Sequence, residues 1–335
     1  MDSRSSSIYC VVGLYISDKP CDIAFVWVLV YVEDLKMAEF GRARSMSIAA
    51  LAAAALLMGP IAGSTIGPLG AVALAEPVDG FSTTSAAPRL ASVDNFRDLA
   101  GPGDGYPLAS GGHLRKGVLY RSSAVRPDAA DVATLAGLNL THDYDLRTSA
   151  EIAEGPDIVP PGTTYVHINI IGDQDPIPTM ADLSAPRARQ LLIHQNKVFV
   201  DDAGERERFG ELFRSIATNP GPQVYHCTSG KDRTGWASAV LQTLVGVSPA
   251  DVMSDYLLTN EYSKKSIDAG AAAATEAYGP EAGAGTRVIL GVFPEALQSG
   301  LDEVRTRYGS MERYLTDGVG LSPATIATLK TTLTA

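Results

Sequence analysis

Cysteine is scarce in this chain, and its scarcity excludes a fold that depends on several disulfide bonds. Only three cysteines, Cys10, Cys21 and Cys227, occur among 335 residues. Small domains that depend on disulfides are far richer in cysteine. Cys10 and Cys21 lie upstream of the mature start predicted below, which leaves Cys227 as a single thiol with no disulfide partner.

Basic residues are also in deficit. Lysine and arginine number 27 against 38 acidic residues, for a formal net charge of −11. The first 75 residues contribute almost nothing to this imbalance, because 22 basic and 32 acidic residues remain without them. Sequence-independent nucleic-acid binding needs a basic face, so we expect no nucleic-acid partner.

No apolar run is long enough to cross a membrane. The segment from Ser45 to Ala75 is uncharged and follows two arginines, but its apolar core, Ile48 to Met58, is shorter than the roughly 20 residues that a span requires. A short basic start, an apolar core and small residues before Glu76 are typical of a secretory signal. We therefore predict a signal peptide at 37–75 and a secreted, extracellular protein. An uncleaved anchor in the cell envelope is the alternative.

The remaining chain divides into three parts. Residues 1–36 do not resemble the start of a signal and are interpreted as an upstream extension that is not native. Residues 76–90 (EPVDGFSTTSAAPRL) have linker composition without periodicity. Residues 91–335 are expected to form one domain, since 45% hydrophobic and 19% charged residues are ordinary for a globular chain.

The hydrophobic pattern alternates between strand and helix and then becomes purely helical. This order predicts an α/β domain of three layers around a mostly parallel sheet, with a helical C-terminal part. Ligands bind such sheets at the carboxyl ends of the strands. Strands are expected at 114–121, 138–146, 165–171 and 222–226, and helices at 128–136, in two parts of 187–213, and at 233–246, 249–257, 264–278, 294–308, 311–315 and from 323 to the end.

The segment YHCTSGKDRTG, residues 225–235, lies between a predicted strand and a predicted helix. A loop of this kind turns successive backbone N–H groups inward, and the following helix adds the positive end of its dipole. Both features favour an anion. They also lower the pKa of a cysteine at the start of the loop, so Cys227 is expected to be a thiolate that can attack phosphorus.

Arg233, six residues further on, would bind two phosphate oxygens with its planar fork, which lysine cannot do. The residues between them, Thr228, Ser229, Gly230 and Lys231, are expected to line the phosphate. Thr234 would donate its hydroxyl to the departing thiolate, and His226 would orient the loop. Lys231 would meet the phosphate or a second phosphate on an inositol ring.

Cysteine and arginine at this spacing are weak evidence alone. Eight fixed residues, from His226 to Gly235, have a random expectation on the order of 10⁻¹⁰ per position. The non-functional alternative for a lone Cys227 is a thiol buried in the core. The loop lacks the serine or threonine after Gly-Lys, and the earlier glycine, that a nucleotide-binding P-loop requires.

HCTSGKDRTG resembles the signature of the atypical bacterial tyrosine phosphatases, among them the secreted mycobacterial and listerial tyrosine and lipid phosphatases. The likeness covers most of residues 93–335, and four further blocks carry it in order: Asn95–Leu99, Leu119–Ser123, Asp145–Thr148 and Tyr308–Ser310. This resemblance implies a phosphatase fold, no metal or other cofactor, and a phosphocysteine intermediate. It implies activity on phosphotyrosine proteins, and on phosphoserine, phosphothreonine or phosphoinositides as well. It also implies a helical lid, for which residues 187–213 are the candidate.

A general acid must protonate the leaving group. Asp232 lies inside the loop and matches the family's loop residue. Its alternative, purely structural role would be to fix the conformation of the loop with its carboxylate. Asp173 follows the strand YVHINII, where tyrosine phosphatases generally supply an acid from elsewhere in the chain; its structural interpretation is a solvated turn residue. We favour Asp232 and leave Asp173 open.

Three arginines outside the loop, Arg97, Arg121 and Arg147, are interpreted as structural ion-pair partners under the sheet. His113, His142, His167 and His194 are scattered without the spacing of metal ligands. The sequence therefore predicts a secreted cysteine-dependent tyrosine phosphatase. The alternative is a non-catalytic phosphate-binding module, which would have no need of both Cys227 and Arg233.

Overall fold

The computed structural model describes residues 10–12, 28–30, 89–173 and 182–335. The chain divides into two units, Met1–Gly80 and Phe81–Ala335. In the first, strand β1 (Cys10–Val12) pairs antiparallel with β2 (Val28–Val30). The predicted signal peptide and nearly all of the predicted linker lie outside the described residues. Within those residues, no helix has the length and apolar character of a membrane span.

A five-stranded sheet forms the centre of the second unit. Its order is β3-β4-β7-β5-β6, and only β3 runs antiparallel to its neighbour. Across the parallel strands, Ser122 pairs with His226, and His226 with Asp145. The carboxyl ends of β4, β7 and β5 therefore lie side by side. The strands are β3 (Arg97–Asp98), β4 (Leu119–Ser122), β5 (His142–Asp145), β6 (Thr164–His167) and β7 (Gln223–His226).

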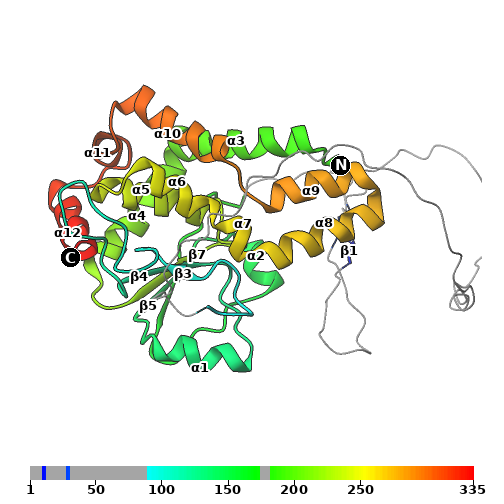
Figure 1. The fold of residues 1–335 in the computed structure, drawn as a ribbon, viewed down its shortest axis with the longest axis horizontal. Helices are drawn as coiled ribbons and strands as arrows, with labels where there is room; N and C mark the ends of the chain where they lie inside the picture. The colour runs from blue at the N-terminus through cyan, green and yellow to red at the C-terminus, as the bar shows by residue number, and fades with distance from the viewer. Residues whose placement is uncertain (1–9, 13–27, 31–88, 174–181) are drawn as a thin grey trace, which may run out of the picture. The chain divides into compact units, whose positions relative to one another are not determined.

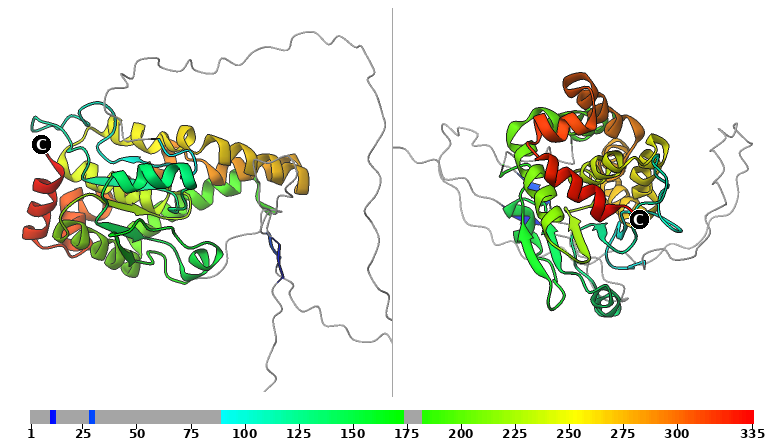
Figure 2. Two further views of the ribbon diagram at one scale, coloured as in Figure 1. Left: turned by 90° about the horizontal axis from the view of Figure 1, so that it is seen from below. Right: turned by 90° about the vertical axis from the view of Figure 1, so that its left-hand side faces the viewer.

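Helices cover both faces of this sheet, with α1 on one side and α4, α5 and α12 on the other (Figures 1 and 2). After β7 the described chain contains helices and no further strand. The helices are α1 (Ala129–Gly137), α2 (Ser149–Glu154), α3 (Ala185–Asp201), α4 (Ala203–Thr218), α5 (Arg233–Val245), α6 (Pro249–Leu257), α7 (Thr259–Tyr262), α8 (Lys264–Tyr278), α9 (Pro280–Leu290), α10 (Pro294–Tyr308), α11 (Met311–Arg313), the π-helical turn Tyr314–Gly318 and α12 (Pro323–Leu333).

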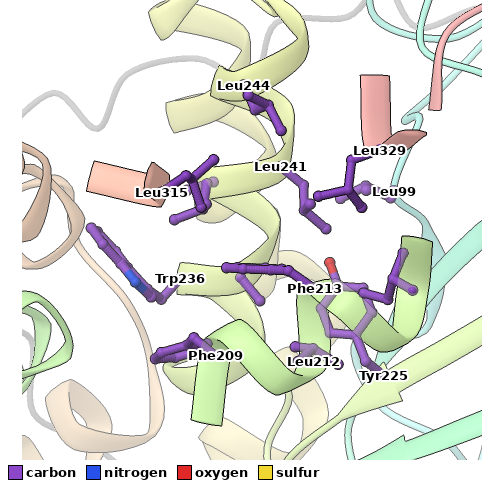
Figure 3. Close-up of a cluster of buried hydrophobic side chains, with 14 of the residues drawn as sticks. Leu99, Phe209, Leu212, Phe213, Tyr225, Trp236, Leu241, Leu244, Leu315 and Leu329 are labelled. Carbon is purple, nitrogen blue, oxygen red and sulfur yellow. The ribbon is translucent and has the colours of Figure 1, made fainter. Parts of the chain in front are cut away.

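The two faces of the sheet bury separate apolar clusters. Successive strand residues point to opposite faces, so Val224 of β7 packs in the small cluster against α1 and Tyr225 packs in the main core. Figure 3 shows Phe209 and Phe213 of α4 around Trp236 and Leu241 of α5 in that core. Because α5 is buried almost along its whole length, the loop that precedes it has a rigid base.

These observations confirm the predicted fold class, a mostly parallel sheet between helical layers. The lid assigned to residues 187–213 is wrong for α4, whose Phe209, Leu212, Phe213 and Ile216 belong to the main core. The amphipathic pattern of that segment reflects burial against the sheet.

Helix α9 was missed because Gly283 and Gly285 hide its periodicity. A Cβ on Gly285 would lie 1.7 Å from the Leu183 carbonyl oxygen, so glycine permits close packing there.

Gly300→Ala tests the packing of α10. The added Cβ would lie 2.6 Å from the Trp236 ring and 2.8 Å from the Asn196 carbonyl oxygen, and overpacking of this kind costs about 1–3 kcal/mol. Urea unfolding of the variant should show that loss. Gly137→Ala, in an exposed part of α1 with open space around the new Cβ, should be neutral or slightly stabilising. Equal stability of the two variants would contradict the packing described.

Candidate functional site

The loop from Cys227 to Asp232 joins β7 to α5, and its peptide carbonyls point away from its centre. Asn95 donates from Nδ2 to the carbonyl oxygens of Ser229, at 3.3 Å, and Gly230, at 2.7 Å. Arg121 donates to the Gly230 oxygen at 2.9 Å, and a backbone N–H donates to the Thr228 oxygen at 3.2 Å. In a trans peptide the N–H of the next residue points the opposite way. The N–H groups of residues 229–231 are therefore turned inward, available for an anion.

Gly230 is required by the path of this loop. Its φ is +66°, and a Cβ there would lie 2.2 Å from the Ser122 carbonyl oxygen. Both the left-handed backbone and the close approach to β4 exclude a larger residue. The loop is thus held against the end of the neighbouring strand.

Cys227 lies at the base of the loop and is only 2% exposed. Burial alone would raise the pKa of the thiol, but the Arg233 charge and the neighbouring Thr234 hydroxyl and N–H outweigh it, and the pKa lies below its ordinary value. The Thr234 hydroxyl is buried and has no hydrogen-bond partner in the described structure. It is therefore available for the role predicted for it, donation of a hydrogen bond to the Cys227 sulfur.

His226 is buried beneath the loop, as its predicted orienting role requires. Its Nδ1 lies 3.3 Å from the Cys227 carbonyl oxygen. Its Nε2 lies 3.2 Å from Asp143 Oδ1 and 3.3 Å from Asp157 Oδ2, in charge contacts without hydrogen-bond alignment. Burial opposes protonation, but the two carboxylates raise the pKa of His226 well above its ordinary value. The same three side chains could hold a metal ion by distance; because imidazolium already balances the carboxylates, we assign none.

The three arginines outside the loop pair with buried carboxylates, as predicted. Arg97 lies 3.1 Å and Arg121 2.9 Å from Asp255, and all three side chains are almost fully buried. Burial would raise the pKa of Asp255, but the two guanidinium groups lower it. Arg147 lies 2.6 Å from Asp145 and from Asp157. Arg121, oriented by Asp255, is one of the two side chains that hold the Gly230 carbonyl outward.

Arg233 starts α5 and is bound by a residue that the sequence analysis did not single out. Its Nη1 and Nη2 donate to Glu151 Oε2 and Oε1, each at 2.7 Å. Thr228 Oγ1 also donates to Glu151 Oε1. Burial opposes ionisation of Glu151, but these bonds lower its pKa to about 2. Glu151 therefore stays charged at the mouth of the loop.

The remaining loop residues differ in their surroundings. Lys231 is 5% exposed, and its Nζ lies 3.1 Å from Asp232 Oδ2. Its charge is thus paired with Asp232 instead of standing free for a second phosphate. The Asp232 side chain is 25% exposed and lies directly before α5.

Asp173 lies outside the loop. It accepts hydrogen bonds from the N–H of Ser149 at 3.1 Å, from the Ser149 hydroxyl at 3.3 Å and from Asn169 at 2.9 Å. These contacts tie it to the first turn of α2. The structure therefore brings Asp232 into the phosphate loop and attaches Asp173 to the helix that carries Glu151.

Sequence reasoning missed Asn95, Glu151 and Asp255. A signal for Glu151 was present, since Thr148-Ser-Ala-Glu151 is a capping box directly after a strand of the sheet. Asn95 belongs to a block used only for the resemblance, and its left-handed φ of 60° has no local signature. Asp255 reads as an ordinary polar position of α6.

The loop, its buried thiol and its arginine define a phosphate-binding site of the cysteine-dependent phosphatase kind. A family model described as the tyrosine phosphatase family matches residues 88–335. The chain belongs to this family, which confirms the resemblance found in the sequence and the prediction of an enzyme.

Bacterial relatives agree with this family assignment. The chain is 30% identical to the triple specificity protein phosphatase PtpB of Mycobacterium tuberculosis, over 72% of this chain and 96% of the relative. It is 28% identical to a tyrosine-protein phosphatase of Nostoc commune, over 77% and 90%. It is also 28% identical to a putative tyrosine-protein phosphatase of Cupriavidus necator, over 70% and 84%.

Asp255→Asn tests the support under the loop. It leaves the buried Arg97 and Arg121 without the one carboxylate that they share, and breaking a buried pair costs about 3–5 kcal/mol. Chemical unfolding should show that loss. Asp268→Asn is the control, because its pairs with Lys264 and Arg287 lie at the surface, and it should leave stability almost unchanged. A stable Asp255→Asn protein would rule out this network as the support.

Proposed function

We propose that this chain removes phosphate from phosphotyrosine through a phosphocysteine intermediate on Cys227. The observation that carries the proposal is the loop itself, in which a thiol of lowered pKa lies beneath inward N–H groups and beside Arg233. A binding module would need the N–H groups and the arginine but not the activated thiol. Family membership supports turnover over binding alone.

In the first step the Cys227 thiolate attacks phosphorus and the bond to the phenolic oxygen breaks. The inward N–H groups and the Arg233 fork stabilise the charge on the three equatorial oxygens. Asp232, already in the loop, gives its proton to the departing phenolate. Asp173 is less suited, because it lies outside the phosphate loop and hydrogen bonds tie it to α2 and Asn169.

In the second step water attacks the phosphocysteine, the S–P bond breaks, and inorganic phosphate leaves. Asp232, now ionised, takes the proton from the water. The Thr234 hydroxyl donates to the sulfur as the thiolate re-forms, consistent with its stabilising effect on the thiolate. His226 keeps the Cys227 carbonyl in place throughout.

The substrate range is proposed to extend beyond phosphotyrosine to phosphoserine, phosphothreonine or phosphoinositides. The printed name of the mycobacterial relative, a triple specificity phosphatase, supports a broad range. Secretion through the signal at 37–75 is part of the same proposal, supported by the composition of that segment.

Cys227→Ser should abolish phosphate release, because serine is not ionised at neutral pH and cannot form the thiophosphate intermediate. Release from a phosphotyrosine peptide, a phosphoserine peptide and a phosphoinositide in parallel would measure the substrate range. Saturable binding of phosphopeptide by the wild type without any turnover would instead favour the non-catalytic module.

Asp232→Asn should slow turnover of phosphoserine peptide by about 10²–10⁴-fold, and of p-nitrophenyl phosphate much less, since nitrophenolate leaves without a proton. Asp173→Asn should affect both substrates equally, through α2 alone. A leaving-group dependence in Asp173→Asn, with none in Asp232→Asn, would transfer the acid role to Asp173.

A further inference from the structure

Glu151 is bound on every side by groups of the site. Oε1 accepts from Arg233 Nη2 and from the Thr228 hydroxyl. Oε2 accepts from Arg233 Nη1 at 2.7 Å and from the Thr148 N–H at 2.8 Å. Four donors on two oxygens satisfy the carboxylate fully. These bonds restrict the Glu151 carboxylate to one orientation. The Arg233 guanidinium that is bonded to it is restricted in the same way.

The contacts of Arg233 also determine which of its edges is left for substrate. Nη1 donates to Glu151 and, at 3.1 Å, to the Leu146 carbonyl oxygen, while Nη2 donates once to Glu151. A guanidinium has five N–H bonds. The two that remain, on Nε and Nη2, are parallel and lie on one edge. Two parallel N–H bonds are the arrangement that binds two phosphate oxygens bidentately.

Helix α2 carries Glu151 and places it beside Arg233. Thr148 caps the helix by accepting from the Glu151 N–H, and the Glu151 side chain returns to the Thr148 N–H. Asp173 adds a second cap at the Ser149 N–H. Although α2 has only six residues and none of them is buried, the two caps fix its first turn, and the bonds of Glu151 to Thr228 and Arg233 attach that turn to the phosphate loop.

We propose that Glu151 is a positioning residue of the reaction, which sets the Arg233 guanidinium so that its Nε and Nη2 edge meets the transferring phosphoryl group. This inference rests on the proposed function and adds a residue to it. Glu151 does not touch the substrate. It acts only through Arg233 and, by way of the Thr228 hydroxyl, through the loop.

The charge of Glu151 makes this role separable from simple electrostatics. A carboxylate beside an anion site weakens binding of the phosphate dianion, so removing the charge alone would favour substrate binding. Removing the grip on Arg233 would instead impair the transition state. Glu151→Gln should therefore lower kcat by about 10- to 100-fold, the scale of a small misplacement of a catalytic group, while KM changes little or falls.

The experiment compares Glu151→Gln with Glu154→Gln, which makes the same charge change at an exposed position of the same helix. Glu154→Gln should keep wild-type kcat and KM on p-nitrophenyl phosphate. Thermal unfolding should show that both proteins remain folded at the assay temperature. The pKa of Cys227, read from the pH dependence of iodoacetamide alkylation, should not rise in Glu151→Gln. Wild-type kcat in a folded Glu151→Gln protein would overturn the inference.

Arg233→Lys supplies a second test by a double-mutant cycle. Lysine has no fork for Glu151 to orient, so Glu151→Gln should cost nothing further in the Arg233→Lys background. An equal loss in both backgrounds would mean that Glu151 acts other than through Arg233, and would sink the proposal.

Vanadate binding separates failure of this inference from failure of the proposed function. Vanadate bound to a thiolate imitates the five-coordinate phosphoryl group, and transition-state analogues lose affinity when transition-state contacts are lost. The vanadate Kd of Glu151→Gln should rise by the factor that kcat/KM falls, because both quantities compare the transition-state complex with the free enzyme. If the wild type releases no phosphate, the proposed function fails, yet a weaker vanadate affinity in Glu151→Gln would still support the positioning role and an unchanged affinity would refute it.

Discussion

The outward orientation of the phosphate-loop carbonyls is the constraint on which the site depends. Consecutive N–H groups that face one point repel each other, so a loop of this shape needs partners on its outer side. Asn95 and Arg121 supply them at Ser229 and Gly230. Arg121 can be buried there only because Asp255 balances its charge. Helix α6, which carries Asp255, thus supports the loop through Arg121.

Two buried charge networks flank Cys227, one behind the phosphate loop and one beneath it. On the β4 side, Asp255 joins two arginines behind the loop. On the β5 side, His226 joins two aspartates beneath it. Each network carries both signs of charge, so neither leaves a large unbalanced charge in the core. The cation that lowers the pKa of the thiol most is Arg233, which also faces substrate. Activation of the nucleophile and recognition of phosphate therefore share one side chain.

How much could be predicted from the sequence depended on whether the signal was local. The pattern of 233–245 and the glycine at 230 are local, and they located α5, Cys227 and Arg233 correctly. The lid assignment failed for α4, because an amphipathic helix has the same pattern over a sheet as over a cavity. Asp173 was placed on the correct loop, but its partner Ser149 lies 24 residues away. Glu151 and Asp255 acquire their roles only through tertiary contacts, which no periodicity reports.

The Glu151–Arg233 pair shows how a site can give up binding strength for orientation. A carboxylate next to a phosphate site reduces the positive potential that attracts the substrate, yet the side chain of Glu151 is 21% exposed and its pKa is held near 2. It is therefore charged whenever substrate arrives. Uniform loss of attraction affects ground state and transition state alike and leaves kcat unchanged, whereas a fixed guanidinium edge favours the transition state alone. A carboxylate in this place is consistent with a site shaped for turnover more than for retention of phosphate.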